Sequence, residues 1–366
     1  MTGIRVFICA LLLFGASPIG AATFEELQKN AMSALAAHDT DHAIELYRSA
    51  TDLRPDWQPG WWFLGMLLYS RGQYADSRGA LQHLASLNDR SGEAWGLMGM
   101  CEAGLGQWTD ALAHIQKGLA LGAGSQPPLG DVLRSNEALL LTKTGKFDLA
   151  LERYLQFLHA GAPSEDLVAG VGLAALRRPL LPSEIPAQDK DLVTLAGQAY
   201  LLNVSGKAQA AEPFFRDLLA RYPAVPGVHY LFASWLMRKD EDAAIAELHR
   251  ELEISPGNAG ADELLAWILL MKTDYSSAFP YALAAERADP ASPVAQYDLG
   301  RAFARSGRVQ EGIRHLEVSA SLDPNNLETE ITLAHAYAMA GRYADAARLR
   351  REALSLKEAA HAAARP

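Results

Sequence analysis

The feature that most constrains the fold of this chain is a regular spacing of prolines. Pro256, Pro290 and Pro324 each follow a run of helix-forming residues, and they lie 34 residues apart. Proline cannot continue a helix, because its ring removes a backbone donor and clashes with the preceding turn. A fixed period of roughly 20 to 50 residues indicates units that stack one on the next, and about 34 residues make a pair of helices. The sequence therefore predicts an all-α fold built from stacked antiparallel helix pairs.

The same period places nine units along the chain. Position eight of most units is Ala or Gly, and position twenty is Ala, Ser or Gly. Small side chains at these two places allow two antiparallel helices to approach closely. The predicted units start at Phe24, Gln58, Gly92, Asp131, Leu192, Val225, Ala259, Pro293 and Leu327.

The predicted turn between the two helices of a unit has its own pattern. Position fifteen is glycine in most units, and glycine is the residue that most readily ends a helix in the left-handed conformation. An aromatic residue often follows two positions later, where it can wedge the helices together. The glycines are Gly72, Gly106, Gly145, Gly206, Gly307 and Gly341, and the aromatic residues are Tyr74, Trp108, Phe147, Tyr275 and Tyr343.

These motifs carry a family resemblance. Trp61 through Gly65, and Trp95 through Gly99, match an opening Trp-x-x-Leu-Gly pattern, so the chain resembles the tetratricopeptide repeat family from Phe24 to about Glu358. The resemblance implies a right-handed α-solenoid, a superhelix whose concave face is made of the first helices and binds proteins or peptides. Phe232 and Lys239 depart from the pattern, so we expect the unit starting at Val225 to be irregular.

The register fails between the fourth and fifth predicted units. Residues 167–178 read as one helix without a matching second helix, and Pro179, Pro182 and Pro186 then predict an extended segment, which is either a linker or a hinge or plug for the groove. The predicted organisation is a signal peptide (1–22), four repeats (23–164), an irregular helix with a proline-rich break (165–191), five repeats (192–360) and a tail (361–366).

The first residues predict export. Arg5 precedes the apolar run Val6–Phe14, and small residues before Thr23 fit cleavage after Ala22. The run is shorter than the roughly 20 apolar residues that span a bilayer. We therefore expect an exported protein, periplasmic or extracellular, with no membrane span after cleavage. Cys9 leaves with the signal peptide and Cys101 remains without a partner, so no disulfide is expected.

Composition and motifs argue against catalysis and nucleic-acid binding. A net charge of −10 leaves no basic stripe for phosphates. His38 and His42 have metal-ligand spacing but lack a third ligand, and Cys101 has no base near it in sequence, so it reads as a buried filler. No phosphate-binding loop or nucleophile elbow is present in the sequence. We expect a chain that is not an enzyme and that needs neither metal nor cofactor.

The resemblance places ligand contacts at fixed positions of the first helices. Met and aromatic side chains there offer large apolar area, and Arg301 and Arg305 lie one helical turn apart, ready to hold an acidic side chain or a chain-terminal carboxylate. The expected function is a scaffold for a protein or peptide partner in the cell envelope. The alternative is a groove for a small ligand or glycan that stacks on Trp62, Tyr69, Trp267 and Tyr297. The predicted groove residues are Trp62, Met66, Tyr69, Tyr200, Asn203, His229, Trp267, Met271, Tyr297, Arg301, Arg305 and His335.

Overall fold

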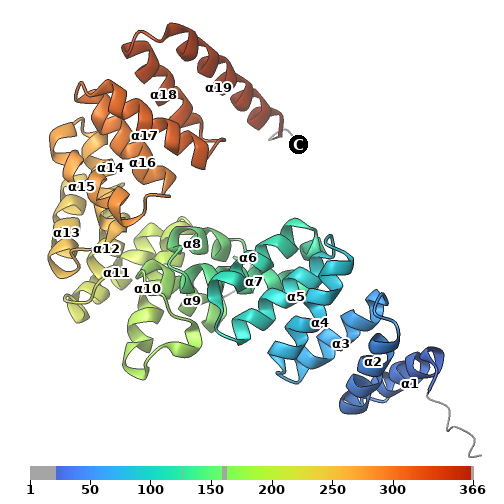
Figure 1. Ribbon diagram of the computed structural model, residues 1–366. Helices are drawn as coiled ribbons and strands as arrows, with labels where there is room; N and C mark the ends of the chain where they lie inside the picture. The colour runs from blue at the N-terminus through green and yellow to red at the C-terminus, as the bar shows by residue number, and fades with distance from the viewer. Residues whose placement is uncertain (1–21, 126, 159–162, 364–366) are drawn as a thin grey trace, which may run out of the picture. The chain divides into compact units, whose positions relative to one another are not determined.

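The computed structural model describes residues 22–125, 127–158 and 163–363, with side-chain burial given up to residue 354. Over these residues the regular structure is α-helix with three short 3-10 turns and no β-strand, which confirms the predicted all-α solenoid (Figure 1). The chain separates into two compact units, residues 1–140 and 141–366, each described here by itself. The predicted signal peptide lies outside the described residues apart from its last residue.

The first unit is a series of helix pairs, in which α1 packs on α2, α3 on α4 and α5 on α6. The first helices α3 and α5 also contact one another, so the pairs stack in order. Its elements are α1 (Phe24–Ala36), α2 (Thr40–Leu53), α3 (Gln58–Ser70), α4 (Tyr74–Leu87), α5 (Gly92–Gly104), α6 (Trp108–Ala120), η1 (Ala123–Ser125) and α7 (Leu129–Lys143), whose last three residues belong to the second unit.

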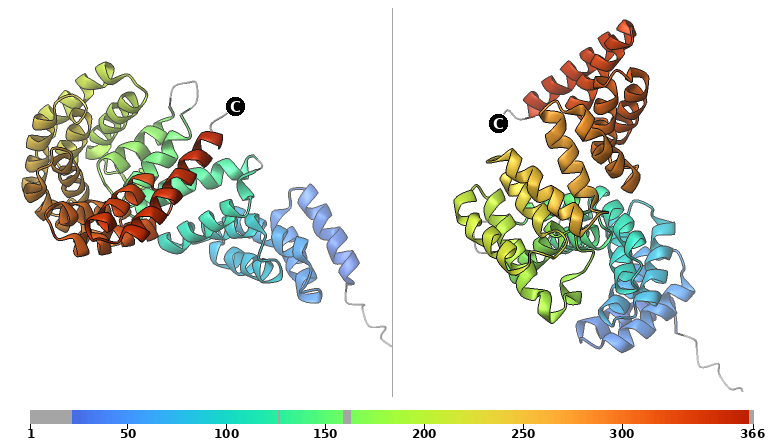
Figure 2. Two further views of the ribbon diagram at one scale, coloured as in Figure 1. Left: turned by 90° about the horizontal axis from the view of Figure 1, so that it is seen from above. Right: turned by 90° about the vertical axis from the view of Figure 1, so that its left-hand side faces the viewer.

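The second unit continues the pattern. The first helices of successive pairs, α10, α12, α14, α16 and α18, each contact the next, so they form one row, which can be followed from green to red in Figure 2. Its elements are α8 (Phe147–Leu155), α9 (Glu165–Ala175), η2 (Pro182–Glu184), η3 (Ala187–Asp189), α10 (Lys190–Val204), α11 (Ala208–Arg221), α12 (Val228–Leu236), α13 (Glu241–Ile254), α14 (Ala259–Met271), α15 (Tyr275–Ala288), α16 (Pro293–Arg305), α17 (Val309–Leu322), α18 (Leu327–Met339) and α19 (Tyr343–Ala363).

Small residues hold the two helices of a pair together, as the period predicts. A methyl group on Gly99 of α5 would lie 2.7 Å from the carbonyl oxygen of Ala111 on α6. On α6, a methyl group on Gly118 would lie 2.6 Å from the backbone nitrogen of Gly96. Contacts this short do not occur between real Cβ atoms and backbone, so the helices touch backbone to backbone at these points.

The turns between paired helices require a left-handed residue. All six predicted glycines have positive φ, from 71° at Gly72 to 88° at Gly307. Three units lack the glycine, and in two of them His38 (φ 59°) and Thr273 (φ 61°) take the same conformation. A β-branched residue such as Thr273 is disfavoured in that region, so the turn geometry is imposed by the packing of the two helices.

Three predicted unit starts differ from the structure. The helices α7 and α10 begin two residues before Asp131 and Leu192, and α12 begins three residues after Val225. In the unit of α12, the predicted frame puts Phe232 at position eight, where a small residue is expected. In the structure the buried Ala233 occupies that crossing point instead. The unit therefore starts one residue later than predicted, at Pro226, and is one residue shorter, which explains why it has no turn glycine.

The proline-rich break also differs from the prediction. The segment after α9 is not fully extended, because η2 and η3 form short turns within it, and Lys143 of α7 donates to the Glu184 carboxylate at 2.7 and 2.8 Å. The helix α9 is not without a partner, since it packs closely on α10. A methyl group on Gly172 would lie 2.0 Å from the carbonyl oxygen of Val193, and one on Gly197 would lie 2.1 Å from that of Val168.

We predict that Gly172→Ala lowers the free energy of unfolding by about 1 to 3 kcal/mol, because the added methyl group has no space at the crossing of α9 and α10. The matched control is Gly79→Ala on the exposed face of α4, where an added methyl group meets nothing within 4 Å. That control should stabilise by about 0.5 to 1 kcal/mol through helix propensity. Urea denaturation followed by circular dichroism measures both changes, and equal effects of the two substitutions would contradict the close crossing.

Candidate functional site

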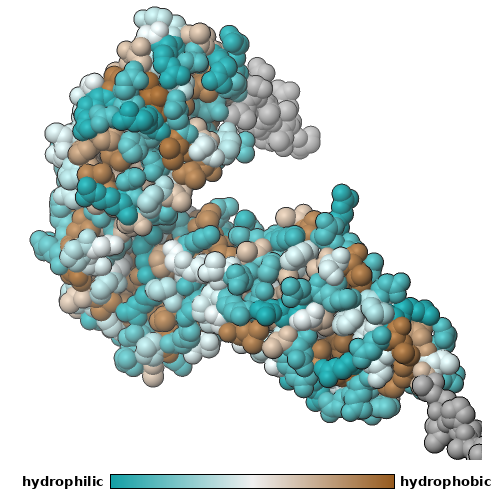
Figure 3. Space-filling model, in the orientation of Figure 1, coloured by the Kyte–Doolittle hydropathy of each residue, from teal (hydrophilic) through white to brown (hydrophobic). Residues whose placement is uncertain are grey.

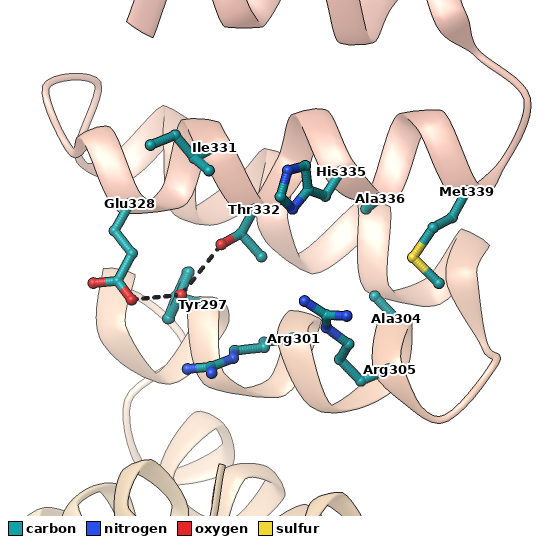
Figure 4. Close-up of a pocket in the computed structure, with 10 residues that line it drawn as sticks. All are labelled: Tyr297, Arg301, Ala304, Arg305, Glu328, Ile331, Thr332, His335, Ala336 and Met339. Atoms are coloured by element: carbon teal, nitrogen blue, oxygen red, sulfur yellow. Dashed lines mark hydrogen bonds between the residues drawn. The ribbon is translucent and has the colours of Figure 1, made fainter. Parts of the chain in front are cut away.

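The candidate site lies in the second unit, on its row of first helices. A pocket of about 220 Å³ opens between α16 and α18 (Figure 4). It is lined by Tyr297, Arg301, Ala304, Arg305, Glu328, Ile331, Thr332, His335, Ala336 and Met339. The pocket therefore brings together four of the predicted groove residues, namely Tyr297, Arg301, Arg305 and His335.

One end of the pocket is fixed by a hydroxyl network. The Tyr297 hydroxyl donates to Glu328 Oε1 at 2.9 Å and lies 3.2 Å from Thr332 Oγ1, as the dashed lines in Figure 4 show. Burial foremost, with the Glu328 carboxylate adding to it, raises the pKa of Tyr297 to about 12. Tyr297 therefore stays neutral and serves as a fixed wall between α16 and α18.

The middle of the pocket carries positive charge. Arg301 is half-buried and its Nη1 donates to the Met271 sulfur at 3.7 Å, which is a weak contact. Arg305 is exposed, and in the part of the chain that the structure describes it has no hydrogen bond or ion pair. Its guanidinium group lies between the two helices, facing His335 (Figure 4). Two guanidinium groups one turn apart, with an imidazole opposite, suit an anionic group.

Two carboxyl groups lie beside this pocket, on the α14 side of α16. Glu263 of α14 is half-buried, and within the described residues it has neither a hydrogen bond nor an ion pair. Asp298 of α16 is 1% exposed, and neither of its carboxyl oxygens has a hydrogen-bond partner. A buried carboxylate without a partner costs free energy, so this pair is expected to hold protons more tightly than an ordinary carboxyl group.

The electrostatics of these groups agree with their burial. Burial foremost, and then the nearby Asp148 carboxylate, raise the pKa of Glu263 to about 7. Burial foremost, and then the Glu263 carboxylate, raise the pKa of Asp298 well above its ordinary value. Burial also raises the pKa of Asp262, the neighbour of Glu263 on α14, to about 6.

The nearest cation on the α14 side is already engaged. Arg177, just after α9, donates to both Asp148 carboxylate oxygens at 3.1 Å and to the Tyr230 hydroxyl at 2.7 Å. Its guanidinium group packs on the backbone of Gly260, where an added methyl group would lie 2.3 Å from it. Arg177 thus joins α8, α12 and α14, and it makes no ion pair with Glu263.

The other predicted groove residues are placed differently. In the first unit, Trp62, Met66 and Tyr69 are half-buried and pack against the hydrophobic cluster that includes Leu97 and Met98 of α5. Their apolar surface is therefore largely used between repeats, which weakens the alternative of an open aromatic stacking groove there.

In the second unit, Tyr200 and Asn203 of α10 are half-buried. Trp267 packs on the core around α14, whereas Met271 is 50% exposed and lies at the rim near Arg301. These four residues belong to the same row of first helices as the pocket, but they do not line it.

His229 requires a correction, because it is 7% exposed and both ring nitrogens have partners. Nδ1 lies 2.6 Å from Glu247 Oε2, and Nε2 lies 2.8 Å from the carbonyl oxygen of Pro223. The fourth residue of other units makes the same bond to the carbonyl six residues earlier, as Trp61 does to Pro55 at 2.8 Å. His229 is therefore a structural residue of a unit that starts at Pro226, and the groove position belongs to Tyr230.

Sequence reasoning missed five residues in or beside the site, three of which are acidic. Glu263, Glu328 and Ile331 stand at positions five, two and five of their units, so the rule that identified Tyr297 could have found them. Asp298 and Thr332 stand at position six, outside that rule, and only the packing of adjacent first helices shows where they lie.

Among the described residues, no group of three or more His, Cys, Asp or Glu side chains is placed to hold a metal ion. None of the helices there combines the length and apolar character that crossing a membrane requires. On the face seen in Figure 3, hydrophobic residues form small separate patches among hydrophilic ones.

The repeat pattern of the sequence matches a known family profile. The sequence profile of the tetratricopeptide repeat matches residues 29–86, 64–126 and 263–326. A search among curated proteins gave no match. Solved structures similar to the chain include MamA from Desulfovibrio magneticus RS-1, with 20% identity and a TM-score of 0.42 over 45% of this chain and 94% of MamA. Another is YrrB, described as a TPR protein with an unusual peptide-binding site, with 17% identity and a TM-score of 0.39 over 44% of this chain and 83% of YrrB.

Helix pairs of fixed period, with small residues at each crossing, define an α-solenoid of the repeat class. The profile match then identifies the repeats in residues 29–126 and 263–326 as tetratricopeptide repeats. Proteins of this family are generally scaffolds that bind protein or peptide partners.

We predict that Asp298→Asn and Glu263→Gln stabilise the protein increasingly as the pH rises. A carboxyl group whose pKa is raised by folding contributes most stability below its unfolded pKa near 4, and that contribution is lost as the pH rises to the folded pKa. For Glu263 the window is therefore from about pH 4 to about pH 7, with a slope of up to about 1.4 kcal/mol per pH unit.

Urea denaturation of wild type and variants between pH 4 and pH 8 measures this difference. The two variants should gain over the wild type as the pH rises, whereas Glu253→Gln, an exposed change on α13, should show no such trend. A difference that does not change with pH would show that these carboxyl groups are not protonated in the fold.

Proposed function

We propose that the chain is a non-catalytic scaffold that binds a protein or peptide partner on the first helices of its second unit, and that the pocket between α16 and α18 takes an acidic group of that partner. The observation that carries this proposal is the exposed Arg305 guanidinium, which faces the pocket with no acidic partner among the described residues. Surface arginines usually find a carboxylate when one is near, as Arg308 does with Glu311 at 2.5 and 2.6 Å.

The shape of the pocket supports a side chain or a chain-terminal carboxylate as the group that enters. The wall formed by α18 is apolar at Ile331, Ala336 and Met339, while Arg301 and Arg305 line the pocket from α16. A planar carboxylate can accept two parallel bonds from a guanidinium group, which gives both affinity and orientation. A partner with an acidic residue beside an apolar one fits this lining.

We further propose that this scaffold works outside the cytoplasm, in the bacterial envelope or beyond it. The support is the sequence of residues 1–22, with its apolar run and small residues before Thr23. Cys101 is a free, buried cysteine, and its thiol donates a hydrogen bond to the Ser77 hydroxyl at 3.1 Å. An oxidising compartment therefore offers this thiol no ready disulfide partner.

We predict that Arg305→Gln weakens binding of acidic peptides about tenfold or more, because a charge-assisted hydrogen bond is lost. Peptides are first selected on the wild-type protein from a random library, and their dissociation constants are then measured by fluorescence anisotropy. The matched control is Arg314→Gln, which removes an exposed arginine from the second helix α17. If no peptide can be selected, or if both variants bind the selected peptides equally, the proposed pocket is wrong.

We predict that the full-length chain, expressed in a bacterium, is recovered outside the cytoplasm with Thr23 as its first residue. Intact mass and N-terminal sequencing of the envelope fraction measure this. Leu12→Arg interrupts the apolar run and should leave an unprocessed chain in the cytoplasm. Processing at the same site in both proteins, or none in the wild type, would argue against export by this segment.

A further inference from the structure

We propose that Glu263 and Asp298 form a second subsite, between α14 and α16, that binds a cationic side chain of the same partner, a lysine or an arginine. This subsite deepens the proposed function and rests on it, since it places a basic residue of the partner beside the acidic group held between α16 and α18.

The first observation is the unpaired state of both carboxyl groups. Asp298 is 1% exposed, and both of its oxygens lack a partner, although most buried polar groups in proteins are hydrogen-bonded. Glu263, on the neighbouring helix α14, is half-buried, and it too has no hydrogen bond or ion pair among the described residues. A group that needs a partner and has none in the free protein is a candidate to receive one.

The second observation is the charge around the pair. The charges that act on Glu263 and Asp298 are those of Asp148, Arg177, Asp289, Arg301 and Glu328, together with their effect on each other. Three of these five are acidic. Arg177 is held by Asp148 and Tyr230, and Arg301 is turned toward Met271, so neither arginine neutralises the pair. The pair therefore has no cation of its own among the described residues, and a cation from a partner could pair with Glu263.

The third observation is position. Glu263 stands at position five of its unit, the same place that Tyr297 occupies in the next unit, and it therefore faces the same row of first helices as the pocket. Asp298 lies on α16 next to Tyr297 and one turn before Arg301. The two subsites share α16 as a common wall, with Glu263 on α14 and with Arg305 in the pocket between α16 and α18.

The binding step exchanges a proton for the cation. Burial raises the pKa of Glu263 to about 7, so the carboxyl group is about half protonated near pH 7. When an ammonium or guanidinium group arrives, Glu263 releases its proton to solvent and the carboxylate accepts hydrogen bonds from the cation. The buried Asp298 of α16, whose own pKa is raised by burial and by the Glu263 carboxylate, adds a second unpaired carboxyl group to the subsite. Binding is therefore expected to release protons.

The test uses the full chain and two single-residue probes, acetyl-arginine amide for the cationic subsite and acetyl-glutamate amide for the anionic pocket. Titrations are followed by NMR of the labelled protein at pH 7. We expect the arginine probe to bind about tenfold more weakly or worse to Glu263→Gln, and to be unaffected by Arg305→Gln and by the control Glu253→Gln. The glutamate probe should show the opposite dependence, on Arg305 alone.

Proton release gives a second readout that a merely structural role of Glu263 would not move. Calorimetry in buffers of different ionisation enthalpy should detect release on binding of the arginine probe to the wild type, and none in Glu263→Gln. If Glu263→Gln does not fold, as judged by circular dichroism, the variant Asp298→Asn replaces it in both measurements.

The outcomes separate the two proposals. If the arginine probe binds equally to the wild type and Glu263→Gln, or with no proton release, the cationic subsite is overturned while the pocket stands. If calcium chloride binds at this pair and the arginine probe does not, the pair is an inorganic cation site and the proposal is also overturned. Failure of the glutamate probe alone refutes the pocket between α16 and α18.

Discussion

The structure depends on how closely paired helices approach at their crossing points. At the contact of α9 with α10, the carbonyl oxygens of Val193 and Val168 stand where the Cβ atoms of Gly172 and Gly197 would be. Backbone contact at each crossing fixes the angle of a helix pair, and the repeated angle sets the first helices in a row. Only because that row is regular do residues one period apart, such as Glu263 and Tyr297, face a common surface.

The period of the sequence was enough to predict the fold, because it records where backbones must touch. It could not predict that His38 and Thr273 would adopt a left-handed turn, since neither residue favours it and the helix pair imposes it. It also failed by one residue at α12, where a shorter turn moved His229 into the core and Tyr230 into the groove position. A one-residue change of length is invisible to composition and appears only when the neighbouring helices are packed.

For a related reason, the sequence predicts the basic residues of the site but not the acidic ones. Arginines at groove positions are identified by residue type, because a long cation seldom buries without a partner. The acidic residues Glu263 and Asp298 are identified because they lack a hydrogen-bond or ion-pair partner among the described residues. Whether a side chain has a partner depends on packing, which the sequence does not show. Arg177 illustrates this: in sequence it is simply a cation after α9, yet the structure commits it to Asp148 and Tyr230 and leaves Glu263 unpaired.

The acidic Glu263 of α14 and the basic Arg305 of α16 bear on specificity more than on affinity. A chain of net charge −10 repels acidic partners at long range, so the arginine pair acts only on a segment already close to the groove. A segment that enters in the reverse direction would set its acidic group against Glu263 and its basic group against Arg305. Like charges in a partly desolvated groove cost free energy, so the arrangement rejects the wrong orientation as well as favouring the right one. The buried, unpaired Asp298 thus lowers the stability of the free protein and sharpens its choice of partner.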